Sequence, residues 1–165
     1  MRHAIVLRAG IIVMMLSVFA GVSGKDKAAV VDSLFRRVQA EGYRVDVDRV
    51  TTASVPNTDR FTPRGFVEVN DTVAKGQLPF FGKAYSLPYG DTSGINFDGK
   101  AEGYTVARKK KEVEVRFTVR NKNESYQFFI QLYPGGKAFV RMNSNQRESV
   151  SYSGDYVFFN DRTEK

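Results

Sequence analysis

Residues 113–142 read VEVRFTVRNKNESYQFFIQLYPGGKAFVRM and carry the clearest strand pattern of the chain. Apolar and polar side chains alternate through it, as expected of antiparallel strands that bury one face and leave the other in water. One register pairs Leu132 with Ala138, Ile130 with Val140 and Phe128 with Met142 on one face, whereas a one-residue shift would pair apolar with polar positions. The stretch therefore predicts a hairpin with a three-residue loop at 134–136, preceded by a further strand.

The rest of the chain predicts shorter strands, since apolar and polar residues alternate in brief runs between turn-forming residues. These strands are expected at 43–47, 66–69, 104–107 and 149–152, with hairpin turns at 108–111 and 120–125. Residues 51–64 hold Thr, Ser, Asn and two prolines, so we expect a loop or a ragged edge there. Turns at intervals of roughly eight to twelve residues indicate a barrel or a curled sandwich.

Residues 25–42 predict an amphipathic helix. Apolar side chains recur there three or four positions apart, at Ala28, Val31, Leu34, Phe35 and Val38. This spacing places them on one face of a helix, which must pack on another element. The predicted fold is therefore mainly β, and α+β by count. It is a single antiparallel β-meander curled into a small barrel or sandwich, with the N-terminal helix over one open end or face.

The first 24 residues predict a secretory signal peptide. Arg2 and Arg8 precede an uncharged apolar run, and small residues follow it, so we expect cleavage after Ala20 or at a later position up to Gly24. The alternative is an uncleaved anchor, but the run is shorter than the roughly 18 to 20 apolar residues of a spanning helix. Removal lowers Lys plus Arg from 25 to 23 against 18 acidic residues, a net charge of +5. Residues 25–165 then form one domain without a transmembrane helix, periplasmic or secreted, which we expect to be a monomer.

The composition excludes several kinds of chemistry. The chain has no cysteine, and its single histidine, His3, lies in the signal peptide. Thiolate nucleophiles, Ser-His-Asp triads and the usual zinc and copper sites are therefore excluded, and no phosphate loop or dinucleotide fingerprint is present. We expect no metal, no cofactor and no enzyme activity. A remote alternative is a carboxylate-dependent hydrolase. Its candidate acids would be Glu68, Asp71, Asp91, Asp98 and Glu102, although such acids normally cap turns.

Two charged stretches invite further hypotheses. Residues 91–98 carry oxygen ligands at intervals, but they lack the order of an EF-hand and its closing glutamate, so we expect no calcium site. The basic run 108–111 falls at a predicted hairpin tip, where lysines are normally solvated. Nucleic-acid binding would need basic residues spread along a face with aromatic residues between them, and export separates the chain from nucleic acid. A weak attraction to anionic envelope lipids or polysaccharides is the most that this charge indicates.

A second distinctive stretch, residues 77–90, reads QLPFFGKAYSLPYG. Its prolines and glycines prevent a regular sheet ladder, yet it holds more apolar surface than a solvated loop tolerates. The leading hypothesis is a non-enzymatic periplasmic binding module that holds a small apolar or amphipathic ligand at the barrel mouth. Phe80, Phe81, Tyr85 and Tyr89 would form the lid or rim. The alternative is that these rings close the core of the domain.

Three aromatic residues fall on the face that should be polar. In the predicted register Phe129, Tyr133 and Phe139 lie opposite the buried side of the hairpin. Either the helix or the 77–90 stretch covers them, or they form an exposed patch. An exposed patch would indicate an envelope domain that interacts with a protein or a glycan partner.

Several short pieces together resemble a known family. They are QLPFFGKA at 77–84, PYG at 88–90, GINFDG at 94–99, KKK at 109–111 and SYSG at 151–154. This combination resembles domain-of-unknown-function family 4251 of Bacteroides-like bacteria. The resemblance implies an exported, mostly-β envelope domain over residues 28–154, and it supplies no catalytic or binding residues. Many such proteins resemble lipoproteins, whereas this chain has no lipobox cysteine to carry a lipid anchor.

The resemblance also implies a modification. Envelope proteins of that lineage are often O-glycosylated at Asp-(Ser/Thr)-aliphatic triplets, and Asp32-Ser33-Leu34 and Asp71-Thr72-Val73 match. The first triplet lies in the predicted helix, where Leu34 packs. Thr72, in a predicted turn, is the reachable candidate.

Overall fold

The computed structural model describes residues 24–52, 64–85, 94–121 and 124–162. Within them the chain forms one α-helix, nine β-strands and a final short 3₁₀ helix. The helices are α1 (Gly24–Ala40) and η1 (Asn160–Arg162). The strands are β1 (Tyr43–Thr52), β2 (Gly65–Asn70), β3 (Val73–Leu78), β4 (Ile95–Lys100), β5 (Glu102–Arg108), β6 (Val113–Asn121), β7 (Glu124–Leu132), β8 (Lys137–Ser144) and β9 (Val150–Phe158).

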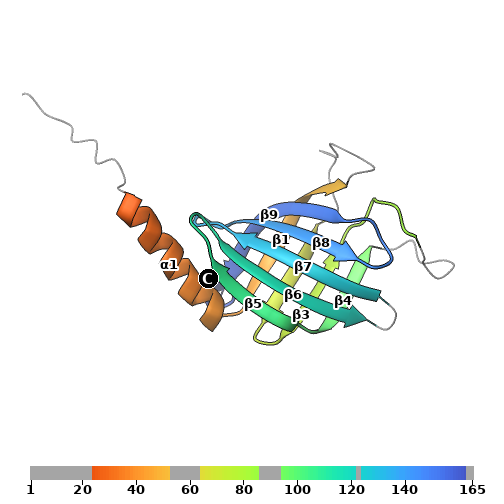
Figure 1. Cartoon of the computed structure of the whole chain (residues 1–165), viewed down its shortest axis with the longest axis horizontal. Helices are drawn as coiled ribbons and strands as arrows, with labels where there is room; N and C mark the ends of the chain where they lie inside the picture. Colours follow the sequence, from red (N-terminus) through yellow and green to blue (C-terminus); the bar gives the residue numbers. More distant parts are fainter. Residues whose placement is uncertain (1–23, 53–63, 86–93, 122–123, 163–165) are drawn as a thin grey trace, which may run out of the picture.

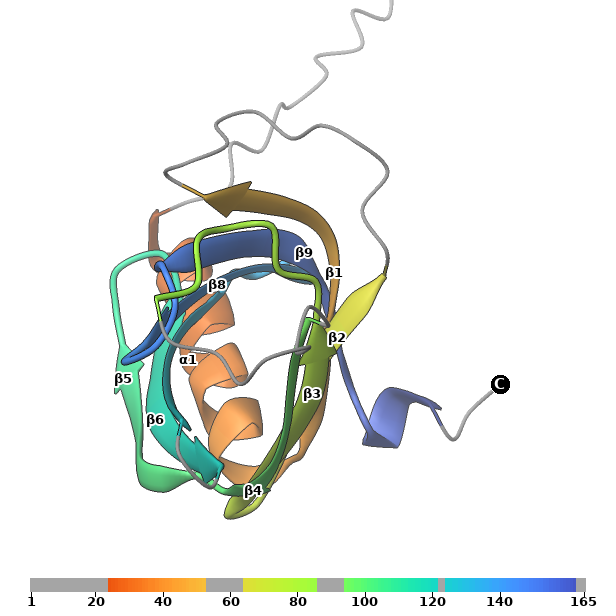
Figure 2. The ribbon, with the colours of Figure 1, turned by 90° about the vertical axis from the view of Figure 1, so that its right-hand side faces the viewer.

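The described strands form one antiparallel sheet in the order β4-β3-β2-β1-β9-β8-β7-β6-β5. The sheet curls until β4 lies beside β6, so the meander is a nearly closed barrel (Figures 1 and 2). Across this junction the Asn121 side-chain amide donates a hydrogen bond to the Asn96 carbonyl over 3.4 Å. The ring of Phe97 on β4 packs on that of Phe128 on β7, with centroids 4.7 Å apart. The predicted fold class, a mainly β barrel with one helix, is confirmed.

The strand pairing predicted for residues 113–142 is also confirmed. β7 and β8 pair in the expected register, and β6 pairs with β7 so that apolar side chains face the barrel interior. The loop between β7 and β8 is closed by a hydrogen bond from the Tyr133 amide to the Lys137 carbonyl, 2.9 Å long. Gly135 and Gly136 in this loop have φ angles of 99° and 89°. Glycine reaches these angles without the steric cost of a Cβ, which explains the composition of the turn.

The helix packs as its apolar pattern predicts. Val31, Leu34 and Val38 are buried, and α1 contacts β5 and β6. Figure 2, which looks along the barrel, shows α1 behind the ring of strands, so the helix covers one end of the barrel. The described part of the chain contains no helix that is long and apolar enough to span a bilayer.

The sequence does not predict β3, where the structure has a regular strand. The inward positions of β3 are Ala74, Gly76 and Leu78, which lack the β-branched and aromatic side chains typical of strands. The space beside Gly76 is filled from β4, since a Cβ at this glycine would lie 2.7 Å from the ring of Phe97. A small residue here is therefore required by its neighbour, and propensity alone cannot reveal it.

Other strand ends also differ from the prediction. β9 continues to Phe158, well beyond the expected 149–152, because Tyr156 and Phe158 extend the inward alternation past serine and glycine. β1 extends to Thr52, while most of the loop expected at 51–64 lies outside the described residues.

The barrel interior is packed with apolar side chains. Tyr43, Phe128, Ile130 and Leu132 are fully buried, and the ring of Phe117 stacks on Phe128 with centroids 5.0 Å apart. Burial raises the pKa of Tyr43 well above its ordinary value. The described residues thus fill the interior with apolar side chains, and the candidate sites lie at the two barrel ends and on the outer face.

Candidate functional site

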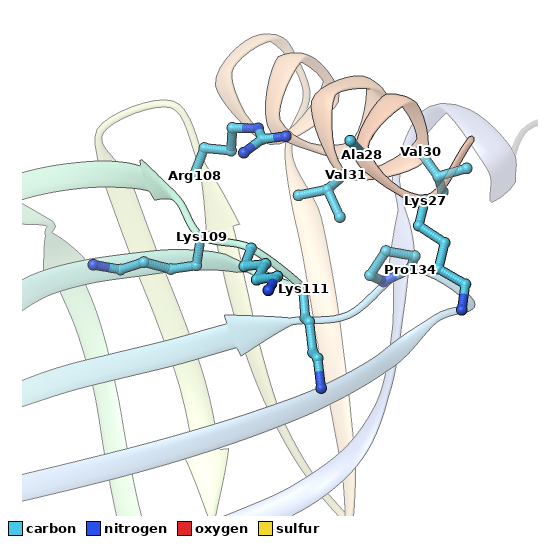
Figure 3. A pocket seen from close by; sticks show the side chains of 9 residues that line it. Lys27, Ala28, Val30, Val31, Arg108, Lys109, Lys111 and Pro134 are labelled. Carbon is cyan, nitrogen blue, oxygen red and sulfur yellow. The ribbon is translucent and has the colours of Figure 1, made fainter. Parts of the chain in front are cut away.

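A groove of about 920 Å³ opens between the first half of α1 and two hairpin turns. One turn joins β5 to β6 and the other joins β7 to β8. The lining residues are Lys27, Ala28, Val30 and Val31 of α1, Arg108, Lys109, Lys110 and Lys111 of the first turn, and Pro134 of the second. Figure 3 shows Val31 and Pro134 facing the space between helix and turns, with Lys27 and Lys111 extending beside it. We call this site the basic groove.

Both walls of the basic groove are held in place by local contacts. Arg108 donates a hydrogen bond from Nε to Asp32 Oδ1, which ties the β5–β6 turn to the helix. The same turn is closed by a 2.9 Å hydrogen bond from the Lys109 amide to the Glu112 carbonyl. On the helix, Val31 is buried, whereas Val30 is 52% exposed. The groove thus has an apolar wall that the core does not cover.

The electrostatics of the basic groove are one-sided. Of its described lining residues, five are cationic and none is acidic. Arg108 is neutralised by Asp32. Among the described residues no carboxylate forms an ion pair with Lys27, Lys109, Lys110 or Lys111. An apolar wall beside unpaired ammonium groups suits a ligand with an apolar chain and an anionic group.

Sequence reasoning missed this site although it noted the basic run. The run 108–111 does lie at a hairpin turn, but the first half of α1 packs beside it, which no local pattern reveals. One signal was available in the sequence. Val30 stands outside the apolar stripe of the predicted helix, so it is an apolar side chain without a place in the core.

The aromatic Leu-Pro stretch lies at the other end of the barrel. Its first two residues end β3, and residues 79–85 then run without regular strand structure over the end opposite α1 (Figures 1 and 2); we call residues 79–85 the strap. The Tyr85 amide donates to the Gln146 carbonyl over 2.8 Å, and the Glu148 amide to the Lys83 carbonyl over 2.9 Å. The Tyr152 hydroxyl donates to the Pro79 carbonyl over 2.9 Å. The strap is therefore fastened to the β8–β9 connection and to β9.

A buried ion pair lies beneath the strap. Arg147 Nε and Glu124 Oε1 are 2.9 Å apart, and their side chains are only 3% and 10% exposed. Glu124 also accepts hydrogen bonds from the Ser144 hydroxyl over 2.6 Å and the Tyr126 hydroxyl over 2.9 Å. The Arg147 guanidinium lies 5.3 Å from the centroid of the Phe80 ring. The network therefore joins β7, β8 and the strap.

The three described residues of the predicted lid differ in their burial. Phe80 is partly buried and packs against the core. Phe81 and Tyr85 are 47% and 71% exposed. Tyr89 lies outside the described residues. The alternative interpretation, in which these rings close the core, therefore holds for Phe80. A lid formed by Phe81 and Tyr85 stays a prediction.

The predicted partner patch lies on the outer face of the barrel. Phe129 faces Arg141 across the hairpin and Phe139 faces Gln131, as the register requires. Both rings and Tyr133 are partly exposed. In Figure 1 the strands β6, β7 and β8 face the viewer, and no other described element lies in front of them. The helix and the described strap therefore leave this face open.

The described candidate acids, Glu68, Asp71, Asp98 and Glu102, lie in ion pairs, in a turn or in the sheet. Glu68 pairs with Arg44 over 2.9 Å and with Lys75 over 3.0 Å, and Lys75 in turn lies opposite Asp98 in the sheet. Asp71 is in the tight β2–β3 turn with a φ of 54°. Glu102 is exposed beside Arg120, and Asp91 lies outside the described residues. No three His, Cys, Asp or Glu side chains of the described residues gather as metal ligands.

Comparison with known proteins places the chain in a family. Residues 25–156 match the model of DUF4251, described as a domain of unknown function. The structure is similar to the crystal structure of a DUF4251 family protein from Bacteroides eggerthii, with a TM-score of 0.55 and 17% identity over 84% of this chain and 94% of that one. At this identity the likeness shows the fold alone. No curated protein matches the chain. Because the family model spans most of the sequence, the chain belongs to the DUF4251 family.

Proposed function

We propose that this protein is a non-enzymatic binding module of the cell envelope that holds an anionic amphiphile in the basic groove. The observation that carries the proposal is the exposed apolar surface of Val30, together with Pro134, beside lysines that have no ion-pair partner among the described residues. The amphipathic ligand expected from the sequence is retained in this proposal. Its site moves from the strap to the opposite end of the barrel.

The size of the groove fits one small amphiphile. Its volume of about 920 Å³ falls within the range of roughly 300–1000 Å³ of small-molecule sites. Burying an alkyl chain of about eight methylenes contributes about 6 kcal/mol, at about 0.8 kcal/mol for each methylene. Two lysines close to the anionic group add about 1 kcal/mol each. The sum omits the entropic cost of association, so it sets the micromolar range as the tightest binding to expect.

The proposal is tested by isothermal titration calorimetry with decanoate and with decanol as the uncharged probe. We expect decanoate to bind more tightly than decanol, because only decanoate uses the lysines. In Lys27→Glu/Lys111→Glu the decanoate affinity should fall about thirtyfold or more, since two contacts of about 1 kcal/mol are removed and two repulsive charges are added. Glutamate at position 27 lies in the first turns of α1, where the helix dipole favours an acid, so the fold should persist.

A matched variant controls for overall charge. Lys83→Glu/Lys100→Glu changes the net charge by the same amount at two exposed lysines outside the groove. Its decanoate affinity should remain close to that of the unchanged protein. Equal losses in both variants, or equal binding of decanoate and decanol, would contradict the proposal.

The strap supplies a second comparison. If Phe81 and Tyr85 form the lid predicted from the sequence, Phe81→Ser/Tyr85→Ser should weaken decanoate binding. The basic-groove proposal expects no change, because neither residue lines the groove. Anionic vesicles of phosphatidylglycerol and phosphatidylcholine distinguish a single amphiphile from a membrane surface. We expect the protein to bind monomeric decanoate but not to sediment with the vesicles.

The envelope location is part of the proposal and has its own test. It rests on the signal peptide predicted from the sequence, which precedes the first described residue, Gly24. Expression in a bacterial host should yield periplasmic protein whose intact mass corresponds to a chain that starts between Gly21 and Lys25. A full-length cytoplasmic product would contradict the location. The same mass reports whether Thr72, which is exposed in the β2–β3 turn, carries a glycan when the native host is used.

A further inference from the structure

The outer face of the barrel carries a continuous furrow that is separate from the basic groove. Two shallow hollows of about 370 and 540 Å³ share Gln131 and Phe139 and run across β6, β7, β8, β9 and β1. The first hollow is lined by Glu114, Arg116, Phe129, Gln131, Phe139, Arg141 and Asn143. Asp48, Arg49, Tyr133, Lys137 and Ser153 extend it into the second.

The aromatic rings in the furrow are neighbours on a rigid sheet. Phe129 pairs with Arg141 and Gln131 with Phe139, so the two phenylalanines are diagonal neighbours on adjacent strands. Such positions lie roughly 7–8 Å apart. The Arg116 guanidinium lies 5.3 Å from the centroid of the Phe129 ring. Each ring is thus flanked by a planar side chain that can donate hydrogen bonds.

The charges in the furrow are largely compensated. Arg116 pairs with Glu114 over 2.5 Å, and Lys137 pairs with Asp155 over 2.7 Å. The lysines of the basic groove differ in this respect, since they have no ion-pair partner in the part of the chain that the structure describes. A surface with balanced charge does not select a strongly charged ligand, because attraction and repulsion nearly cancel.

The exposure of the rings argues against a protein partner. Protein interfaces are anchored by large apolar side chains that enter pockets on the other molecule. The large hydrophobic side chains with the greatest exposure lie elsewhere in the described residues, at Val30, Val73, Phe81, Tyr85 and Val157. The furrow instead presents rings set among amide, carboxylate and guanidinium groups.

We propose that the furrow binds an uncharged oligosaccharide chain. The C–H face of a sugar ring is apolar and can stack on Phe129 and Phe139, while its edge carries hydroxyl groups. These hydroxyls both donate and accept hydrogen bonds. The side-chain amides of Gln131 and Asn143 can both donate and accept hydrogen bonds with them. The Glu114 carboxylate can accept, and the Arg141 guanidinium can donate. A furrow longer than one sugar unit fits several consecutive units of a chain.

Affinity electrophoresis tests this inference, in native gels containing dextran, laminarin or galactomannan, with polygalacturonate as the charged polymer. We expect at least one neutral polymer to retard the protein. In Phe129→Ser/Phe139→Ser the affinity for that polymer should fall about tenfold or more, because two stacking contacts are lost. Gln131→Ala, which leaves both rings, should also weaken it. Thermal unfolding of each variant verifies that the barrel is intact.

The groove variant Lys27→Glu/Lys111→Glu serves as the control, and it should bind the neutral polymer as the unchanged protein does. Failure of all three neutral polymers to retard the protein would overturn the inference. So would equal retardation of the Phe129→Ser/Phe139→Ser and unchanged proteins, or retardation by polygalacturonate alone. Dimerisation that is lost in the Phe129→Ser/Phe139→Ser variant would assign the face to a second copy of the chain and would also overturn it.

Discussion

Replacing Glu124 by glutamine should destabilise the protein more than any exposed charge change. Arg147 and Glu124 form a 2.9 Å ion pair whose side chains are 3% and 10% exposed. In Glu124→Gln the guanidinium of Arg147 stays charged and buried but loses the negative charge of Glu124. The Tyr126 hydroxyl, which donates to Glu124 Oε2 over 2.9 Å, would face an amide group that cannot accept.

The magnitude follows from the burial of the pair. Removing one partner of a buried ion pair costs about 3–5 kcal/mol, because the remaining charge is neither solvated nor compensated. Glutamine keeps one oxygen that can accept from Arg147 and from the Ser144 hydroxyl, so we expect the lower end, about 3 kcal/mol. In a domain of this size that corresponds to a fall of about 10 °C in melting temperature.

Urea unfolding with linear extrapolation gives the free energy of unfolding for this comparison. Glu102→Gln is the matched control, because it removes the partner of Arg120 from a pair whose side chains are 45% and 72% exposed. Exposed pairs contribute about 0–1 kcal/mol, so this variant should remain close to the unchanged protein. A loss below about 1 kcal/mol in Glu124→Gln, or equal losses in both variants, would show that the network beneath the strap does not hold the barrel end together.

Further predictions concern two glycines, one acid and the groove. Gly154→Ala should lower the free energy of unfolding by about 3 kcal/mol, because the new Cβ would lie 2.8 Å from the Val47 Cα. Gly135→Ala has open space around the new Cβ but a φ of 99°, so it should lower the free energy of unfolding by only about 1–2 kcal/mol. The urea concentrations at which the two variants unfold test this order. Partial burial disfavours the charge of Glu68, but hydrogen bonds from Arg44 and Lys75 lower its pKa below 4.5 overall. The two hydrogen bonds therefore stabilise the folded protein above about pH 4.5, and this contribution is lost as the pH falls through the lowered pKa of Glu68. In Glu68→Gln the free energy of unfolding should consequently depend less on pH at acidic pH. Decanoate affinity should fall as sodium chloride is raised from 0.05 to 0.5 M, and calorimetry showing no salt dependence would count against the lysines.

The strands of the C-terminal half could be predicted because every second side chain is apolar and must face the core, which fixes the register. In residues 113–142 the inward residues are all apolar and most are β-branched or aromatic, so a one-residue shift would expose all of them at once. β3 could not be predicted, because its inward residues, Ala74 and Gly76, are small to accommodate Phe97, which comes from β4. Complementary sizes on different strands leave no local pattern.

The candidate sites show the same division. The outer position of Phe129 and Phe139 follows from the hairpin register and is confirmed. The basic groove depends on α1 lying beside the turn at 108–111, a contact between segments distant in sequence. The aromatic stretch at 77–90 marks the family well, yet in the structure Phe80 packs on the core while Phe81 and Tyr85 face solvent.

The position of the bound amphiphile is best measured by titrating isotope-labelled protein with decanoate and following amide and methyl chemical shifts. Binding in the basic groove predicts that the largest shift changes fall on Val30, Val31 and residues 108–111, with small changes in the strap and the outer furrow. Shift changes centred on Phe81 and Tyr85, or spread evenly over the surface lysines, would contradict specific binding between α1 and the β5–β6 turn.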